Sequence, residues 1–325
     1  MLLLEPSNPL KVVGNLTKTT NMSRNELFPK QIPSIQEFED KSNSVGMGLR
    51  YPHLIEFSVQ KPAQIGWVEV HSENFYSLGG PDFDYLYKIR EQYPVSLHGI
   101  GMSLGSANGL DTRHIDLVKG LMEVIDPFLL SDHLSWNTIS NKFLPDLLPI
   151  PFNKESLDIF ADNISFVQDK LQRRILIENP STYFEYVNST YSEPEFLNAL
   201  MQKTGAGMVL DVNNIYISGL NNGWSSREYI DAINPFFVEE MHVAGHSQKK
   251  ILDNEFLYID SHDSIVCEEV WNLFEYALKK CGRVVPTLVE WDANIPELEV
   301  LLGEAAKIDY YLDQVGKREN YICVV

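Results

Sequence analysis

The sequence predicts an α/β protein built as a (β/α)8 barrel, also called a TIM barrel, that follows an N-terminal extension. From residue 45 onward, eight short apolar runs alternate with longer amphipathic stretches, as repeated strand–helix units do. The chain has 325 residues, which suits a barrel that typically needs about 250. An open doubly wound sheet is the alternative, but such a sheet usually has fewer strands.

The first 43 residues differ from the rest of the chain in composition. They are polar and rich in Pro, Asn, Ser and Lys, and they show no clear hydrophobic period. Such a segment buries too little apolar surface to offset the entropy of ordering it. We therefore expect a loosely ordered extension over residues 1–43 and a single barrel domain over residues 44–325.

Eight short apolar runs are the expected barrel strands, because buried parallel strands read as apolar runs. They cover residues 45–50, 65–71, 94–101, 127–133, 174–179, 207–213, 239–245 and 287–292. Seven amphipathic stretches between and after them predict helices over residues 81–93, 111–125, 154–171, 192–205, 225–234, 264–282 and 295–312. Asp111 and Thr112 are candidate N-caps, and Gly205 is a candidate C-cap.

Composition argues against several classes of function. The net charge of −19 disfavours a nucleic-acid partner, because such binding normally needs a basic stripe. No apolar run is long enough to span a bilayer, so we expect no membrane insertion. The chain start lacks the features of a secretory signal, and three scattered cysteines suit reduced thiols. These features indicate a cytoplasmic protein.

Most of the predicted strands end in acids, amides or histidines. The apolar run 208–210, for example, leads into Asp211, Asn213 and Asn214. One such ending is explained by a turn, but its repetition after other strands is not. In a (β/α)8 barrel the carboxyl ends of all strands meet at one face, where the active site forms. We therefore expect these side chains to form a ring at the C-terminal face.

A ring of acids and histidines predicts a site for metal ions. Crowded carboxylates cannot all ionise unless cations compensate for their charge. Mixed imidazole, carboxylate and amide ligands suit Fe, Mn, Zn or Mg, and the ring offers more ligands than a single ion takes. A non-catalytic scaffold is disfavoured, because unpaired buried charges destabilise a fold.

Nine segments, in this order, resemble the multinuclear non-haem iron-dependent oxidative enzymes, a former domain of unknown function that includes the oxidases of methanobactin biosynthesis. They read GLRYPH (48–53), EVHSENF (69–75), SLHGIGMSLG (96–105), SDHLSW (131–136), LIENPSTY (176–183), LDVNNIYIS (210–218), MHVAGH (241–246), DSHD (260–263) and LVEWD (288–292). The set spans nearly the whole predicted barrel, and only the N-terminal extension is longer than the resemblance covers.

The resemblance implies a chemistry and its partners. Members of this family are barrels that hold two or three irons, mixed Fe(II) and Fe(III). They use O2 to oxidise ribosomally synthesised precursor peptides, typically at cysteine. They commonly need a small partner protein that binds the leader peptide and delivers the substrate.

The resemblance also assigns residues by motif position. The implied ligands are His53 and His98 for one iron, Glu178 as a bridge to a second, Asp211, His242 and Glu290 for that second iron, and Asn214, Asp260 and His262 for a third. Residues expected to orient ligands or transfer protons are Asp132, His133, Asn179, His246 and Asp292, with Asp132, His133 and Asp292 as the catalytic candidates.

Two other classes of metal enzyme remain as alternatives. A divalent-metal sugar isomerase of the xylose-isomerase-like barrels would use this fold without a redox change. A trinuclear zinc phosphodiesterase on the same fold would act on nucleic acid, which the net charge of −19 disfavours.

Overall fold

The computed structural model describes residues 44–139, 142–252 and 255–322. The predicted extension over residues 1–43 lies outside these ranges, so its loose order and the domain boundary at residue 44 stay predictions. Within the described ranges, none of the helices combines the length and the apolar character that crossing a bilayer requires.

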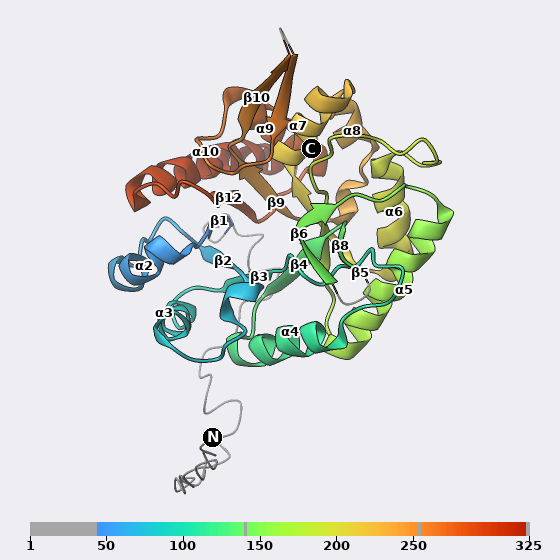
Figure 1. Cartoon of the computed structure of the whole chain (residues 1–325). Helices are drawn as coiled ribbons and strands as arrows, with labels where there is room; N and C mark the ends of the chain where they lie inside the picture. The colour runs from blue at the N-terminus through green and yellow to red at the C-terminus, as the bar shows by residue number, and fades with distance from the viewer. Residues whose placement is uncertain (1–43, 140–141, 253–254, 323–325) are drawn as a thin grey trace, which may run out of the picture. The chain divides into compact units, whose positions relative to one another are not determined.

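Eight parallel strands close into a barrel, which confirms the predicted fold class (Figure 1). They are β1 (Val45–Gly48), β2 (Trp67–His71), β3 (Val95–His98), β4 (Leu129–His133), β7 (Leu176–Glu178), β8 (Gly207–Asp211), β9 (Val238–Ala244) and β12 (Thr287–Glu290). Each strand pairs with the next one in this order, and β12 pairs with β1. Neighbours in the barrel are therefore joined by strand–helix–strand connections.

Helices surround the barrel on its outside (Figure 1). They are α2 (Leu54–Gln60), α3 (Pro81–Arg90), α4 (Thr112–Ile125), α5 (Lys154–Leu171), α6 (Glu193–Thr204), α7 (Val212–Asn222), α8 (Ser226–Ala232), α9 (Glu268–Cys281) and α10 (Leu298–Ile322). Short 3-10 helices are η3 (Tyr51–His53), η4 (Ser72–Phe75) and η5 (Pro235–Phe237). All seven predicted helices are present, and the predicted caps Asp111 and Gly205 flank α4 and α6.

Two further helices, α2 and α7, were not predicted. The predicted strand 207–213 ends two residues early because Asp211 caps α7: its carboxylate accepts the N–H of Asn214 at 2.6 Å. A carboxylate in this position satisfies a backbone donor of the first helical turn. Helix α2 has seven residues, which are too few to show a helical period in the sequence.

Two antiparallel hairpins also lie outside the predicted pattern. Strands β5 (Trp136–Ile139) and β6 (Lys142–Leu148) form one, and β10 (Ser247–Leu252) and β11 (Glu255–Ile259) form the other. They follow the carboxyl ends of β4 and β9, in connections that can grow without changing the barrel.

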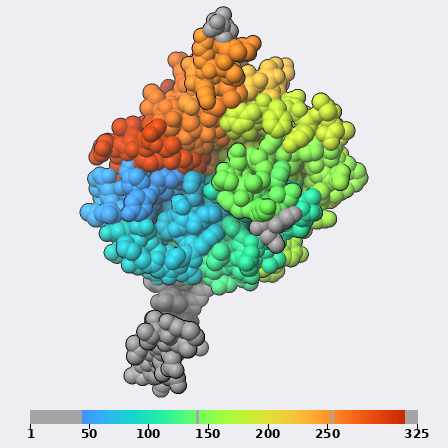
Figure 2. All heavy atoms as spheres, in the orientation of Figure 1, coloured from blue at the N-terminus to red at the C-terminus, as the bar shows by residue number. Residues whose placement is uncertain are grey.

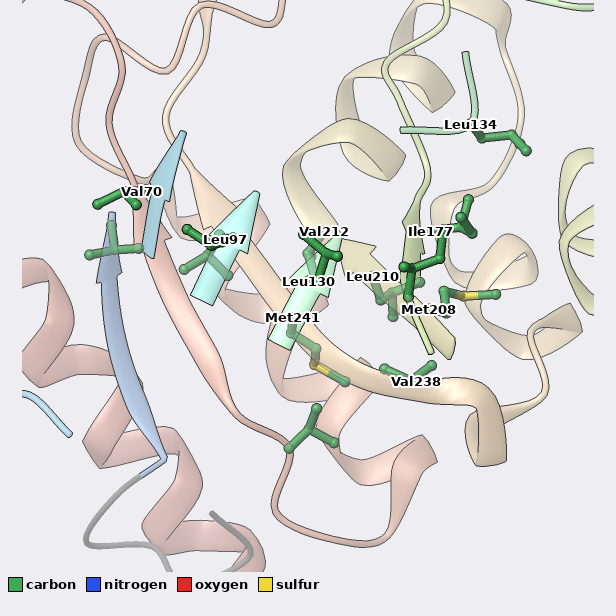
Figure 3. Close-up of a cluster of buried hydrophobic side chains, with 14 of the residues drawn as sticks. Val70, Leu97, Leu130, Leu134, Ile177, Met208, Leu210, Val212, Val238 and Met241 are labelled. Carbon is green, nitrogen blue, oxygen red and sulfur yellow. The ribbon is translucent and has the colours of Figure 1, made fainter. Parts of the chain in front are cut away.

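The barrel wall separates two apolar clusters. Outward-pointing side chains such as Val70, Leu97 and Leu130 pack in the layer between the strands and the helices (Figure 3). A smaller cluster lies among the inward-pointing side chains of the strands; it comprises Trp67, Leu129, Leu176, Val209 and Leu288, together with Phe128, which precedes β4. Because side chains alternate along a strand, the polar residues at the carboxyl ends lie above this inner cluster.

Glu193, at the start of α6, contacts α8. Its carboxylate accepts a hydrogen bond from the Tyr229 hydroxyl at 2.8 Å. Burial, helped by the nearby charge of Glu185, raises the pKa of Glu193 to about 7. The folded protein therefore holds this proton more tightly than the unfolded chain does. Its contribution to stability is present below about pH 4.5 and is lost as pH rises to about 7.

We expect Glu193→Gln to raise the melting temperature at pH 8 and to leave it nearly unchanged at pH 5. The amide keeps the acceptor for Tyr229 and cannot ionise, so it removes the cost of charging a half-buried carboxyl. Thermal unfolding of both proteins at the two pH values measures the effect. Glu123→Gln, at an exposed position of α4, is the control and should shift neither value. Equal shifts of Glu193→Gln at both pH values would contradict this prediction.

Candidate metal centre

The carboxyl ends of the barrel strands bring buried acids and histidines into one space. These residues are His98, His133, Glu178, Asp211, His242 and Glu290. All but His242 are the last residue of their strand. The parallel register places His133 beside Glu178, and Asp211 beside His242. The predicted ring at the C-terminal face is thus built by strand pairing.

One group consists of His98, His133 and Glu178. Oε2 of Glu178 lies 3.1 Å from Nε2 of His98 and 3.4 Å from Nε2 of His133. Nδ1 of His133 donates to the Gly99 carbonyl at 3.1 Å, which turns its Nε2 toward Glu178. Burial, together with His133, lowers the pKa of His98 well below its usual value. A neutral imidazole with a free lone pair is the form that binds a metal ion.

A second group consists of Glu178, Asp211, His242 and Glu290. Nδ1 of His242 lies 3.7 Å from Oε1 of Glu178 and 3.3 Å from Oε2 of Glu290. Glu178 belongs to both groups and presents a different oxygen to each. This is the arrangement expected of a carboxylate that bridges two ions.

Several buried polar atoms in this space have no hydrogen-bond partner within the described residues. They are Oδ2 of Asp211, Oδ1 of Asn214 and both ring nitrogens of His242. An unsatisfied buried polar group costs about 1–3 kcal/mol. Coordination of cations by these atoms would remove that cost. The residues present therefore fit a centre that holds more than one metal ion.

The residues predicted for a third ion lie partly together. Nε2 of His262 is 2.6 Å from Oδ1 of Asp260, and Nδ1 of His262 is 2.9 Å from Oδ2 of Asp292. The amide nitrogen of Asn214 donates to the Asn179 carbonyl at 3.1 Å, which leaves Oδ1 of Asn214 as its free acceptor. The carboxylate of Asp292 thus orients the ring of His262. Carboxylates orient ligand histidines in this way in metal sites.

His53 belongs to neither ligand group among the described residues. It lies in η3, beyond the end of β1, and its Nε2 donates to the Pro296 carbonyl at 2.7 Å. His133, which we expected to act in catalysis, lies in the first ligand group, and the role of His53 as an iron ligand stays a prediction.

Asp132, the other catalytic candidate, is held by the backbone. Its two oxygens accept the N–H groups of Met102 at 3.0 Å and of His133 at 2.7 Å. These bonds fix the segment after β3 against β4, beside the first ligand group. This geometry favours a positioning role for Asp132 over proton transfer.

Two buried acids that received no assigned role lie next to His242. Oε1 of Glu240 is 3.5 Å from Nε2 of His242, and Oε1 of Glu69 is 3.8 Å from it. Burial, together with Glu240, raises the pKa of Glu69 well above its usual value. The alternation of side chains along β9 places Glu240 on the same face as His242. That spacing is the signal in the sequence that could have identified Glu240.

Arg50 is a buried cation beside the second group. It donates to Glu290 at 2.9 Å and to Asp292 at 2.5 Å. We expect Arg50→Met to lower the free energy of unfolding of the metal-free protein by about 3–5 kcal/mol, because the buried carboxylate of Glu290 loses its arginine partner. Arg113→Met, which breaks a surface pair with Asp111, should cost about 0–1 kcal/mol. Denaturant titration measures both, and equal losses would contradict the prediction.

Comparison with known proteins adds a family relationship. A family profile described as "RiPP precursor modification enzyme MbnB/TglH/ChrH" matches residues 44–313. A UPF0276 protein of Vibrio parahaemolyticus is 44% identical over 271 residues, which cover 83% of this chain and 93% of that protein. A UPF0276 protein of Chromobacterium violaceum is 40% identical over 273 residues, or 84% of this chain and 96% of that protein.

Solved structures share the barrel at low sequence identity. An L-ribulose 3-epimerase aligns with a TM-score of 0.55 at 13% identity and covers 86% of this chain and 98% of its own. A D-tagatose 3-epimerase-like protein aligns with a TM-score of 0.54 at 15% identity, over 84% and 98% of the two chains. A xylose isomerase domain containing protein of Salmonella typhimurium has a TM-score of 0.51 at 11% identity, over 86% and 97%. These similarities show the fold alone and confirm a xylose-isomerase-like barrel.

Proposed function

Because the chain belongs to the family of RiPP precursor modification enzymes MbnB/TglH/ChrH, we propose that it is a multinuclear non-haem iron enzyme. It uses O2 to oxidise cysteine residues of a ribosomally synthesised precursor peptide. A small partner protein binds the leader of this peptide and delivers it, and the reaction takes place in the cytoplasm. The net charge of −19 would steer a basic leader or partner toward the enzyme.

The observation that supports this proposal most directly is the position of Glu178 between two ligand groups. Its Oε2 lies near the pair His98 and His133, and its Oε1 lies near His242. Two imidazoles and one carboxylate form the donor set that leaves positions open on Fe(II) in non-haem oxygenases. The bridge favours two ions, and the contact between Asp260 and His262 adds a candidate third site.

Bound at these residues, iron would supply electrons for the reduction of O2 and a Lewis-acidic site for a cysteine thiolate. The chain itself orients the donor rings. The Gly99 carbonyl holds a proton on Nδ1 of His133, and Ser131 lies 2.7 Å from Nδ1 of His98. Both rings are thereby oriented with Nε2 toward Glu178. Below these donors, the inner apolar cluster, which includes Trp67, packs inside the barrel.

Metal analysis combined with Mössbauer spectroscopy tests the proposal. The protein is produced with supplemental iron, purified anaerobically and mixed with a cysteine peptide. We expect two or three irons per chain, with ferrous and ferric signals that respond to the peptide. Stoichiometric zinc or manganese, with no bound iron and no effect of O2, would overturn the proposal and favour the isomerase or phosphodiesterase alternative.

A further inference from the structure

A cavity of about 480 Å³ lies outside both ligand groups. It is bounded by the connection after β6, by the loop between β7 and α6, and by α8. The Tyr186 hydroxyl reaches across it to the Pro149 carbonyl. In Figure 2 the loop, coloured yellow-green, lies on the visible face next to the green atoms of the hairpin β5–β6.

The walls of this cavity combine aromatic rings with carboxylates. The rings belong to Phe152, Phe184, Tyr186, Tyr191, Trp224 and Tyr229, and the carboxylates belong to Glu185, Glu193 and Glu228. Trp224 stacks on Tyr229 with a centroid distance of 5.3 Å. No lysine, arginine or histidine is among the described residues that line the cavity. The neighbouring Arg227 is engaged elsewhere, because its guanidinium lies over the ring of Tyr276.

The three carboxylates therefore have no cationic side chain beside them among the described residues that line the cavity. Glu193 is the carboxylate placed deepest, where it accepts the hydrogen bond from Tyr229. Its pKa is raised to about 7 by burial and by Glu185, which is the response of a carboxyl that lacks a cation. Aromatic faces attract cations by about 0.5–2 kcal/mol. The carboxylates and the aromatic rings of the cavity thus both favour a positively charged ligand.

The loop that forms one wall of the cavity also reaches the metal centre. It begins just after Glu178, the bridging candidate. Along the loop, the Tyr183 hydroxyl accepts the backbone N–H of Asp260 at 3.3 Å, and the N–H of Thr182 donates to Ser218 on α7 at 2.8 Å. A peptide that places one residue at the metal centre would therefore find this cavity along the same loop.

We propose that this cavity binds a lysine or arginine side chain of the precursor peptide, at a position distinct from the cysteine that is oxidised. The inference rests on the proposed peptide substrate and adds a specificity site to it. The long aliphatic stem of either side chain packs against apolar walls while its charged end meets the carboxylates. An apolar side chain would leave those carboxylates unpaired, and an acidic one would be repelled.

NMR titration of the full-length, metal-loaded protein at pH 8 tests this assignment. The probes are three tripeptides with acetylated and amidated ends: Gly-Lys-Gly, Gly-norleucine-Gly and Gly-Glu-Gly. We expect the lysine peptide to bind at least about tenfold more tightly than the other two, as an added cation–π contact and ion pair imply. Glu193→Gln and Glu228→Gln should each weaken lysine binding by about tenfold. Glu123→Gln, which removes the same charge on α4, should have no effect.

Equal affinity for the lysine and norleucine peptides would overturn the inference, and so would unchanged binding in both cavity variants. If n-pentylamine binds as tightly as the lysine peptide, the assignment to a peptide is wrong. The titration is repeated on metal-free protein, where we expect the same affinities. If the protein binds no iron and O2 has no effect, the proposed function is wrong. The NMR titration would still give its own result, because it does not depend on iron.

Discussion

Glu178→Gln is expected to abolish peptide oxidation while the barrel still folds. Glu178 presents one carboxylate oxygen to His98 and the other to His242. A carboxamide has one acceptor oxygen and one NH2 donor, so it can serve only one of the two ligand groups. Loss of residues that merely support a ligand lowers metal affinity or activity about 10–100-fold, so loss of the bridge should exceed about 100-fold.

The measurement combines metal content per chain with O2 consumption in the presence of a cysteine peptide. We expect the variant to lose at least one ion and to consume no O2 above background. Circular dichroism and a cooperative thermal transition establish that it is folded. Glu123→Gln controls for the change in net charge, and it should match the original protein in both readouts. Retained turnover in Glu178→Gln with iron bound would refute the bridging role.

The barrel and the main ligand ring follow from features that the sequence displays directly. Most of the barrel strands are apolar runs that end in a polar residue, and parallel strands bring their ends to one face. Glu178, Asp211 and Glu290 are the last residues of their strands. Once the strands are recognised, pairing fixes where such residues lie. This is why the positions of these three acids could be predicted without a structure.

Residues beyond the strand ends are different, because a loop can turn in many directions after the last strand residue. Arg50 and His53 both follow β1, yet Arg50 contacts Glu290 while His53 contacts Pro296. The sequence places both near the rim and does not say which one reaches inward. The same uncertainty applies to Asp260 and His262, which lie in the segment after β11. For such residues, resemblance to a family supplied positions that pattern analysis could not.

Asp211 shows why a strand end and a helix start were difficult to separate. It ends β8, accepts the N–H of Asn214 through Oδ1 and leaves Oδ2 without a hydrogen-bond partner. One oxygen therefore caps α7, and the other remains available for a metal ion. In the sequence, the run from Asp211 to Asn214 reads equally well as a turn after a strand. The capping bond that decides between the two depends on a backbone conformation that no residue pattern reports.

His133 and His53 provide the sharpest test of the first ligand group, because both are buried histidines, one at the end of β4 and the other in η3 after β1. We expect His133→Ala to lose one metal ion per chain, since it removes a nitrogen that lies 3.4 Å from Glu178. His53→Ala should keep the full metal content and lose about 1–2 kcal/mol of stability, because the Pro296 carbonyl loses its donor.

Metal analysis and denaturant titration of the two variants separate these roles. The comparison is matched, because each variant removes one buried imidazole. A His53→Ala protein that loses iron, beside a His133→Ala protein that retains it, would reverse our assignment. That result would restore the ligand set implied by the family motifs, and it would require η3 to move toward Glu178 when metal binds.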